Sequence, residues 1–116
     1  MSGALASHSD SVNDEAGYSR KKSLASETER FKRFGELAAK YGTGIAIENM
    51  VDHLGIGYGR RFGCNAEDLL ELLDKLNADD IFGICWDTGH ANLAQVNQPA
   101  AIQQIGSRLK ALHIND

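Results

Sequence analysis

Three side chains of metal-ligand type follow directly after three short apolar runs of the sequence. Glu48 follows the run IAI, Asp87 follows ICW, and His113 follows AL. Two carboxylates and an imidazole form an O,O,N donor set, which suits a divalent cation such as Mg²⁺, Mn²⁺, Co²⁺ or Zn²⁺. Glu48, Asp87 and His113 are therefore candidate ligands of a single metal ion.

Each of these residues also has a purely structural interpretation. Glu48 could begin a loop, and Asp87, which is followed by Thr88 and Gly89, could form a turn. His90 and His113 could each be a histidine without a ligand. Because ligand types recur at three corresponding points, the pattern as a whole favours a shared metal site over three unrelated roles.

The elements that position these residues alternate between helices and buried strands. A capping-box spacing of Ser26 and Glu29 predicts a helix start there, and Gly42 suits a left-handed residue at its end. The apolar stripe expected on this helix consists of Phe31, Phe34, Leu37, Ala38 and Tyr41.

Two more helices and three strands complete the pattern. Asn65 is expected to cap the second helix, whose buried face is Leu69, Leu70, Leu72, Leu73 and Leu76. Pro99 begins the third helix, with a stripe of Ile102, Ile105 and Leu109. The predicted strands are 44–47, 81–86 and 110–114, and the predicted loops are 51–63 and 88–98.

Alternating helices and apolar strands indicate an α/β fold with a parallel sheet built from right-handed βαβ units. The carboxyl ends of parallel strands meet on one face, so Glu48, Asp87 and His113 are expected to converge. Residues 1–23 are polar and contain six serines. They are expected to form an arm or loop: residues 1–8 could be a strand remnant, and residues 9–22 are expected to be a loop. Residues 24–116 form the folded domain.

Composition excludes several classes of function. The net charge of −4 provides no basic excess to bind nucleic acid. No apolar run reaches the roughly 20 residues of a membrane span, and the N-terminal stretch does not have the pattern of a signal peptide. Cys64 and Cys85 are isolated and are expected to be inert thiols, which favours a reducing, cytoplasmic location.

The glycine-rich stretch 55–60 does not match a dinucleotide-binding loop, because its last position is Arg60. It is expected to be a flexible loop. Arg60 or Arg61 could bind an anionic group of a substrate.

The motifs IAIENM at 45–50, RFG at 61–63, CWDTGHANL at 85–93 and LHIND at 112–116 resemble the sugar phosphate isomerase/epimerase superfamily. These proteins are xylose isomerase-like TIM barrels, and the wider group includes endonuclease IV. The resemblance spans residues 24–116 and implies strands 5–7 of the barrel. With 116 residues, the chain is shorter than the about 250 of a closed barrel, so a partial, roughly half barrel is expected.

The resemblance also implies a role for each site residue. Glu48 looks like a fifth-strand metal ligand that also transfers a proton, and Asp87 and His113 look like the ligands of strands six and seven. His90 and Arg61 are expected to contact the substrate. His8 falls near a histidine that often follows the fourth strand of the family.

The implied function is a metal-dependent sugar or sugar-phosphate isomerase or epimerase, acting through an enediolate. The second proton-transfer group of the family, an eighth-strand glutamate, has no counterpart here, so the lone chain is expected to be incomplete. The alternatives are an inactive barrel fragment that binds a metal or ligand, and an endonuclease IV-like phosphodiesterase. Open strand edges, with unpartnered inward faces at Ile45, Ile47, Ile84 and Leu112, predict either a homo-oligomer, which we favour, or a piece of a longer gene product.

Overall fold

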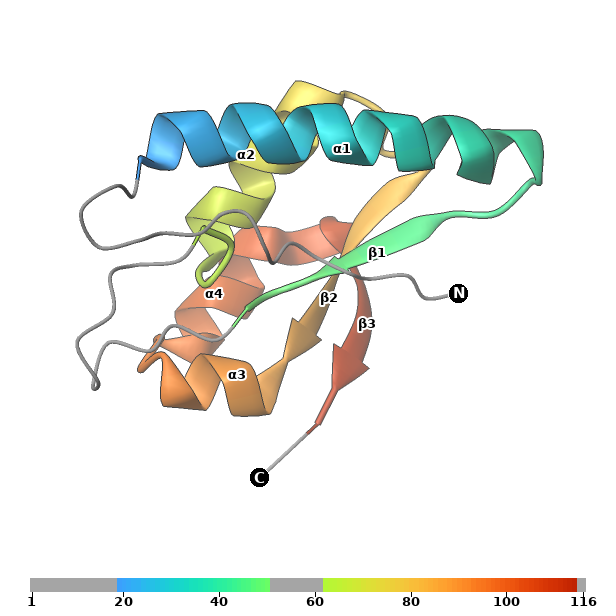
Figure 1. Ribbon diagram of the computed structural model, residues 1–116. Coiled ribbons are helices and arrows are strands. Elements are labelled where there is room, and N and C mark those ends of the chain that lie inside the picture. The colour runs from blue at the N-terminus through green and yellow to red at the C-terminus, as the bar shows by residue number, and fades with distance from the viewer. Residues whose placement is uncertain (1–18, 51–61, 115–116) are drawn as a thin grey trace.

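The computed structural model describes residues 19–50 and 62–114, in which helices and strands alternate (Figure 1). The elements in chain order are α1 Arg20–Lys40, β1 Ile45–Glu48, α2 Ala66–Leu76, β2 Phe82–Asp87, α3 Thr88–Leu93, α4 Gln98–Ile105, the 3₁₀ helix η2 Gly106–Arg108, and β3 Leu109–His113. Most of the predicted loop 51–63 lies outside the described residues.

The three strands form one parallel sheet in the order β1-β2-β3, which confirms the α/β prediction. Glu48 is opposite Cys85, and Asp87 is opposite His113. The β2–β3 register shifts by one residue, because Ile84 is opposite Leu109 whereas Cys85 is opposite Ala111. Each observed strand lies within one residue of the predicted one.

Helix α1 begins seven residues before the predicted start, with Ser19 and not Ser26 as its N-cap. The Ser19 side chain caps it by accepting a hydrogen bond from the Lys22 amide at 3.2 Å, so Ser26 lies inside the helix. The prediction of a loop up to residue 22 is therefore wrong at its end. A tertiary contact accounts for the extension, because the Arg20 guanidinium lies 2.7 Å from carboxylate oxygens of both Asp68 and Glu71.

The buried face of α1 differs from the predicted stripe. Phe31 and Ala38 are buried, but Phe34, Leu37 and Tyr41 are 42%, 54% and 72% exposed. The helix instead approaches the sheet at Gly35, where an added Cβ would lie 2.6 Å from Cζ of Phe82. The buried positions therefore follow the Phe31–Gly35–Ala38 side.

The bounds of helices α2, α3 and α4 are set by side chains that cap their first turns. Asn65 caps α2 as predicted, with its Oδ1 accepting from the Asp68 amide at 2.8 Å. The predicted loop 88–98 is wrong at its start, because the Asp87 side chain caps the short helix α3. Helix α4 ends at Ile105, so Leu109 belongs to β3 and not to the helix stripe.

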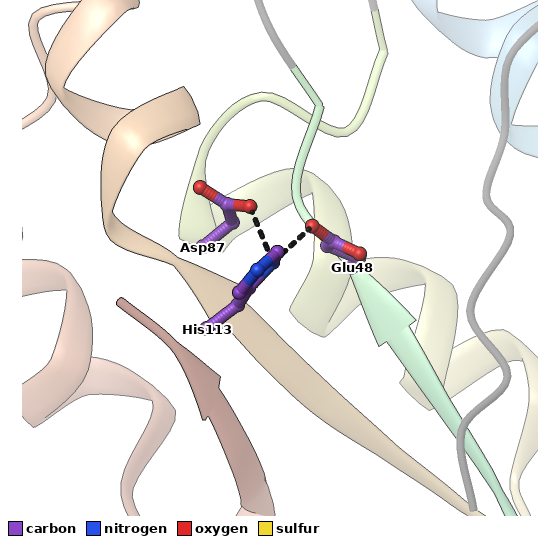
Figure 2. Close-up of side chains that lie close together, drawn as sticks. All are labelled: Glu48, Asp87 and His113. Atoms are coloured by element: carbon purple, nitrogen blue, oxygen red, sulfur yellow. Dashed lines mark ion pairs between the residues drawn. The ribbon is translucent and has the colours of Figure 1, made fainter. Parts of the chain in front are cut away.

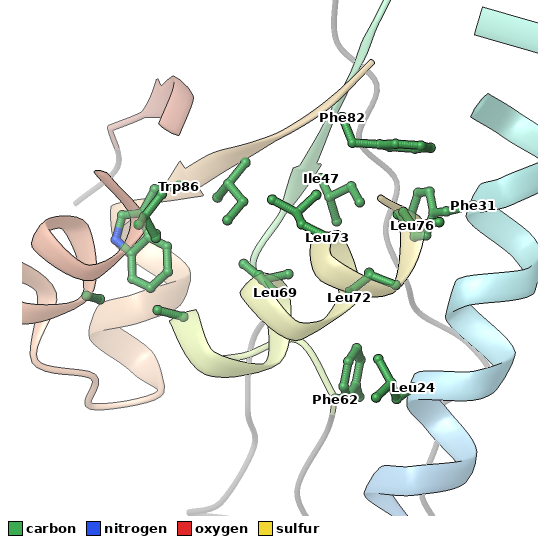
Figure 3. Close-up of a cluster of buried hydrophobic side chains, with 14 of the residues drawn as sticks. Leu24, Phe31, Ile47, Phe62, Leu69, Leu72, Leu73, Leu76, Phe82 and Trp86 are labelled. Atoms are coloured by element: carbon green, nitrogen blue, oxygen red, sulfur yellow. The ribbon is translucent and has the colours of Figure 1, made fainter. Parts of the chain in front are cut away.

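The hydrophobic core lies between one face of the sheet and the helices (Figure 3). Ile47, Ile84 and Trp86 are at most 1% exposed and belong to one cluster with the leucines of α2 and Phe31. The expectation that Ile45, Ile47 and Ile84 face the barrel interior is therefore wrong. Because side chains alternate along a strand, Glu48 and Asp87 lie on the opposite face.

Strand β3 is the most exposed of the three. Leu112 lies opposite Trp86 and so shares its face of the sheet, which means that the expectation of an inward-facing Leu112 is also wrong. Leu112 is 51% exposed, and Ile114 beyond the strand is 75% exposed. Among the described helices, none is long and apolar enough to cross a membrane.

Candidate metal centre

The structure brings Glu48, Asp87 and His113 together at one edge of the sheet (Figure 2). Each is the last residue of its strand, and the three strands are parallel neighbours. One ligand atom from each residue lies within 4.8 Å of the others. Their convergence follows from strand direction and register, as the sequence pattern led us to expect.

The cluster is buried on one side and open on the other. His113 Nδ1 lies 2.9 Å from Asp87 Oδ2 and 3.7 Å from Glu48 Oε2. The Asp87 side chain is 1% exposed, that of Glu48 24%, and that of His113 59%. A ligand would therefore approach from the His113 side.

His90, in the first turn of α3, lies at the margin of this cluster. Its ring Nδ1 is 2.8 Å from the backbone oxygen of Asn49, and 3.7 Å from a carboxylate oxygen of both Glu48 and Asp87. Its backbone amide donates to Asp87 Oδ1 at 2.9 Å. Because a carbonyl oxygen only accepts, Nδ1 carries the proton and Nε2 is left for another partner.

Asn49 is a site residue to which sequence reasoning gave no role. Its side chain is fully buried and binds both backbone groups of Asp87: Oδ1 accepts from the Asp87 amide at 2.6 Å, and Nδ2 donates to the Asp87 carbonyl at 3.1 Å. The available signal was its place directly after Glu48 in the ENM string.

Two carboxylates crowd this site. Burial raises the pKa of Glu48 above its ordinary value, and both a hydrogen bond with Asp87 and the negative charge of Asp87 raise it further. His90 and His113 act on it in the opposite direction. Such a pair is stabilised either by a shared proton or by a cation.

The thiols near the site fit the prediction of inert cysteines. Burial raises the pKa of Cys85, and the charges of Glu48 and Asp87 raise it further. Cys64 is 1% exposed. Neither environment favours a reactive thiolate.

The donor set fits a divalent cation. Metal–ligand bonds of about 2.0–2.2 Å place the ligand atoms of one ion within about 4.4 Å of one another, close to the spread of this cluster. Two oxygens and one imidazole nitrogen suit the ions considered above. Two other expected residues, Arg61 and His8, lie outside the described residues.

Comparison with known proteins identifies the family. Residues 3–116 match the model of the xylose isomerase-like TIM barrel family. The chain belongs to this family. Its three parallel strands with their helices are thus an open part of a TIM barrel.

Two solved structures resemble this TIM barrel chain. One is the 3-keto-D-glucoside 4-epimerase YcjR from E. coli, with 18% identity and a TM-score of 0.69 over 84% of this chain and 35% of that one. The other is a D-tagatose 3-epimerase-like protein, with 25% identity and a TM-score of 0.62 over 79% of this chain and 32% of that one.

The amino-acid sequence is also similar to that of a curated protein, the uncharacterized protein y4fM of Sinorhizobium fredii. It is 32% identical over 75 residues, which cover 62% of this chain and 21% of the relative. The chain thus spans about a fifth of this relative and about a third of the two solved neighbours.

Proposed function

We propose that this chain contributes most of a divalent-metal site to a sugar or sugar-phosphate isomerase or epimerase. The observation that carries the proposal is the convergence of Glu48, Asp87 and His113 at the ends of adjacent parallel strands. Membership of the xylose isomerase-like family supports it. So do the structural neighbours, one an epimerase of a ketoglucoside and one similar to a ketohexose epimerase.

The metal would be held by Glu48, Asp87 and His113, with Mn²⁺, Mg²⁺, Co²⁺ or Zn²⁺ as candidates. When bound, it would supply Lewis-acid stabilisation of negative charge on the substrate oxygens. The Asp87 carboxylate is fixed by the α3 cap, since Oδ1 accepts from the His90 amide and leaves Oδ2 toward His113.

Glu48 is the proposed base. Its carboxylate removes the proton bonded to the carbon beside the sugar carbonyl, and the electron pair of that C–H bond becomes part of an enediolate. His90, with its Nδ1 directed to Asn49, would contact a substrate oxygen through Nε2. Arg61 would bind an anionic substrate group.

Return of the proton on the other face needs a second acid. We propose that a second copy of the chain completes the site in a homo-oligomer. Strands β1 and β3 each pair with one neighbour in the described sheet, and the exposed Leu112 and Ile114 lie beside or beyond the β3 edge. Light scattering should report a dimer or larger assembly at micromolar concentration, whereas a folded monomer would contradict this part of the proposal.

A second candidate function is a metal- or ligand-binding barrel fragment without turnover. The observation favouring it is that the chain spans about a third of each solved neighbour. In either case we expect the protein in the cytoplasm, as proposed from the isolated positions of Cys64 and Cys85 in the sequence.

Metal binding and proton exchange together test the proposal. Calorimetric titration with Mn²⁺ should show one site in the wild type and a much weaker one in Glu48→Gln, with Asp74→Asn as the control at an exposed carboxylate. Equal binding by wild type and Glu48→Gln would disprove the ligand assignment.

Exchange in D₂O distinguishes the two candidate functions. Incubation of the Mn²⁺-loaded protein with D-tagatose or a 3-ketoglucoside should replace the carbon-bound proton by deuterium, which NMR detects even if no second acid completes epimerisation. Loss of exchange in Glu48→Gln would support the enzyme. Metal binding without exchange in the wild type would favour the binding fragment.

A further inference from the structure

Asn49 connects the two carboxylate-bearing strand ends. The last residue pair of the β1–β2 ladder is Glu48 and Cys85, so Asn49 and Asp87 lie beyond it. The Asn49 side-chain amide places an acceptor and a donor side by side, as successive peptide groups of a strand do: Oδ1 accepts from the Asp87 amide at 2.6 Å and Nδ2 donates to the Asp87 carbonyl at 3.1 Å. The side chain thus extends the ladder by one step.

The same residue also orients His90. The Asn49 backbone oxygen lies 2.8 Å from His90 Nδ1, while the His90 amide is bound to Asp87 Oδ1 at 2.9 Å. Asn49, Asp87 and His90 therefore form a closed set of hydrogen bonds on the buried side of the cluster. The side chain of Asn49 is 0% exposed, so water does not compete for its two bonds to Asp87.

We infer that Asn49 is a positioning residue, which holds Asp87 and His90 so that Oδ2 of Asp87 faces His113. The relevance of Asn49 to catalysis rests on the proposed function. The effect of Asn49 on the histidines of the cluster does not depend on that function. Partners behind a ligand of this kind fix its orientation, and their loss commonly weakens metal binding 10- to 100-fold.

Stability alone would not distinguish this role from a purely structural one. Loss of the Asn49 amide removes both of its buried hydrogen bonds to the Asp87 backbone and destabilises the fold. The matched control is Asn65→Ala, because Asn65 also accepts a backbone N–H at 2.8 Å, at the start of α2 and outside the candidate site. Both alanine variants should melt at a lower temperature, but only one should bind metal more weakly.

The first measurement is Mn²⁺ affinity by calorimetry, with thermal unfolding of each metal-free protein alongside. We expect Asn49→Ala to bind Mn²⁺ about 10- to 100-fold more weakly than wild type, and Asn65→Ala to bind it as wild type does. Asn49→Gln, which keeps the amide but displaces it by one methylene, is measured in parallel in case the alanine variant does not fold. Wild-type affinity in a folded Asn49 variant would overturn the inference.

The second measurement needs no metal. Long-range ¹⁵N–¹H spectra at pH 8 should show the proton of His90 and of His113 on Nδ1 in the wild type, because both Nδ1 atoms face an acceptor. In the Asn49 variants, which keep the backbone oxygen facing His90 but lose the side-chain bonds to Asp87, the His113 signal should shift toward the Nε2–H form, while Asn65→Ala leaves it unchanged. If the wild type binds no metal, the proposed function fails, and an unchanged His113 signal in the Asn49 variants would separately disprove the positioning role.

Discussion

Nδ1 of His113 lies 2.9 Å from Oδ2 of Asp87, across the pair of strands β2 and β3. The contact joins a carboxylate that is 1% exposed to an imidazole that is 59% exposed. It is therefore the point at which the buried side of the candidate site meets solvent.

His113→Ala should weaken Mn²⁺ binding by about tenfold or more, because it removes one of three candidate ligands and the imidazole that faces Asp87. Calorimetric titration measures the effect. Lys110→Gln is the control, since Lys110 is an exposed residue of the same strand. Equal affinities in His113→Ala and wild type would exclude His113 from the site.

Glu48→Gln should stabilise the metal-free protein at neutral pH. The pKa of Glu48 is raised in the folded state, chiefly by burial, so the folded protein holds the Glu48 proton to higher pH than the unfolded chain does. Protonated Glu48 therefore contributes to the free energy of unfolding of the wild type at low pH, and this contribution is lost as the pH rises through the raised pKa. Glu48→Gln does not ionise, so its stability does not fall in this way as the pH rises.

The comparison is made by thermal unfolding with a chelator present, at several pH values between acid and neutral. The advantage of Glu48→Gln over wild type should be largest at neutral pH and should shrink as the pH falls below the raised pKa. An advantage that is constant with pH would show that the charge of Glu48 is not its source.

Arg20→Gln should lower the free energy of unfolding by about 1–2 kcal/mol, because Asp68, whose side chain is 3% exposed, loses an ion-pair partner. The expected cost is moderate because Arg20 is 42% exposed and Asp68 still accepts from the Gly63 amide at 3.0 Å. Urea unfolding measures it. Arg108→Gln breaks pairs with two exposed carboxylates and should cost about 0–1 kcal/mol, so equal losses would contradict this account.

Gly35→Ala should destabilise the protein by about 1–3 kcal/mol despite the better helix propensity of alanine. The added Cβ would lie 2.6 Å from Cζ of Phe82, inside the contact of α1 with the sheet. The control is Gly42→Ala, which meets no atom within 4 Å and is strained only by its positive φ of 70°. Urea unfolding of both variants separates crowding from backbone strain, and a neutral Gly35→Ala would mean that Phe82 moves aside.

The strands and the candidate ligands could be predicted because their signals are local. Runs such as IAI before Glu48 are buried among the helices, and a polar ligand type directly after such a run marks the strand end. Parallel order then brings the strand ends to one edge of the sheet, whereas the register shift that turns His113 toward Asp87 leaves no signal in the sequence. The family resemblance rested on the same strings and is confirmed by the family match.

The errors occurred where a tertiary contact decides the structure. The start of α1 depends on the contact of Arg20 with α2, which no pattern near residue 20 reveals. Helix α3 depends on Asp87 acting as a cap as well as a candidate ligand. The role of Asn49 depends on a partner 38 residues away, and a single amide has no periodicity that would reveal it.

The one-residue register shift between β2 and β3 decides which way the last side chain of β3 points. Without this shift, Asp87 would be opposite Leu112, and the His113 imidazole would lie on the other side of the sheet from Asp87. Inserting a single codon near position 110, with the bulge kept at one residue, would thus leave three paired strands and an intact core while moving the imidazole out of the cluster. Insertions in this short stretch are therefore expected to abolish metal binding without any change in the core, whereas loss of the extra residue Lys110 would keep His113 opposite Asp87.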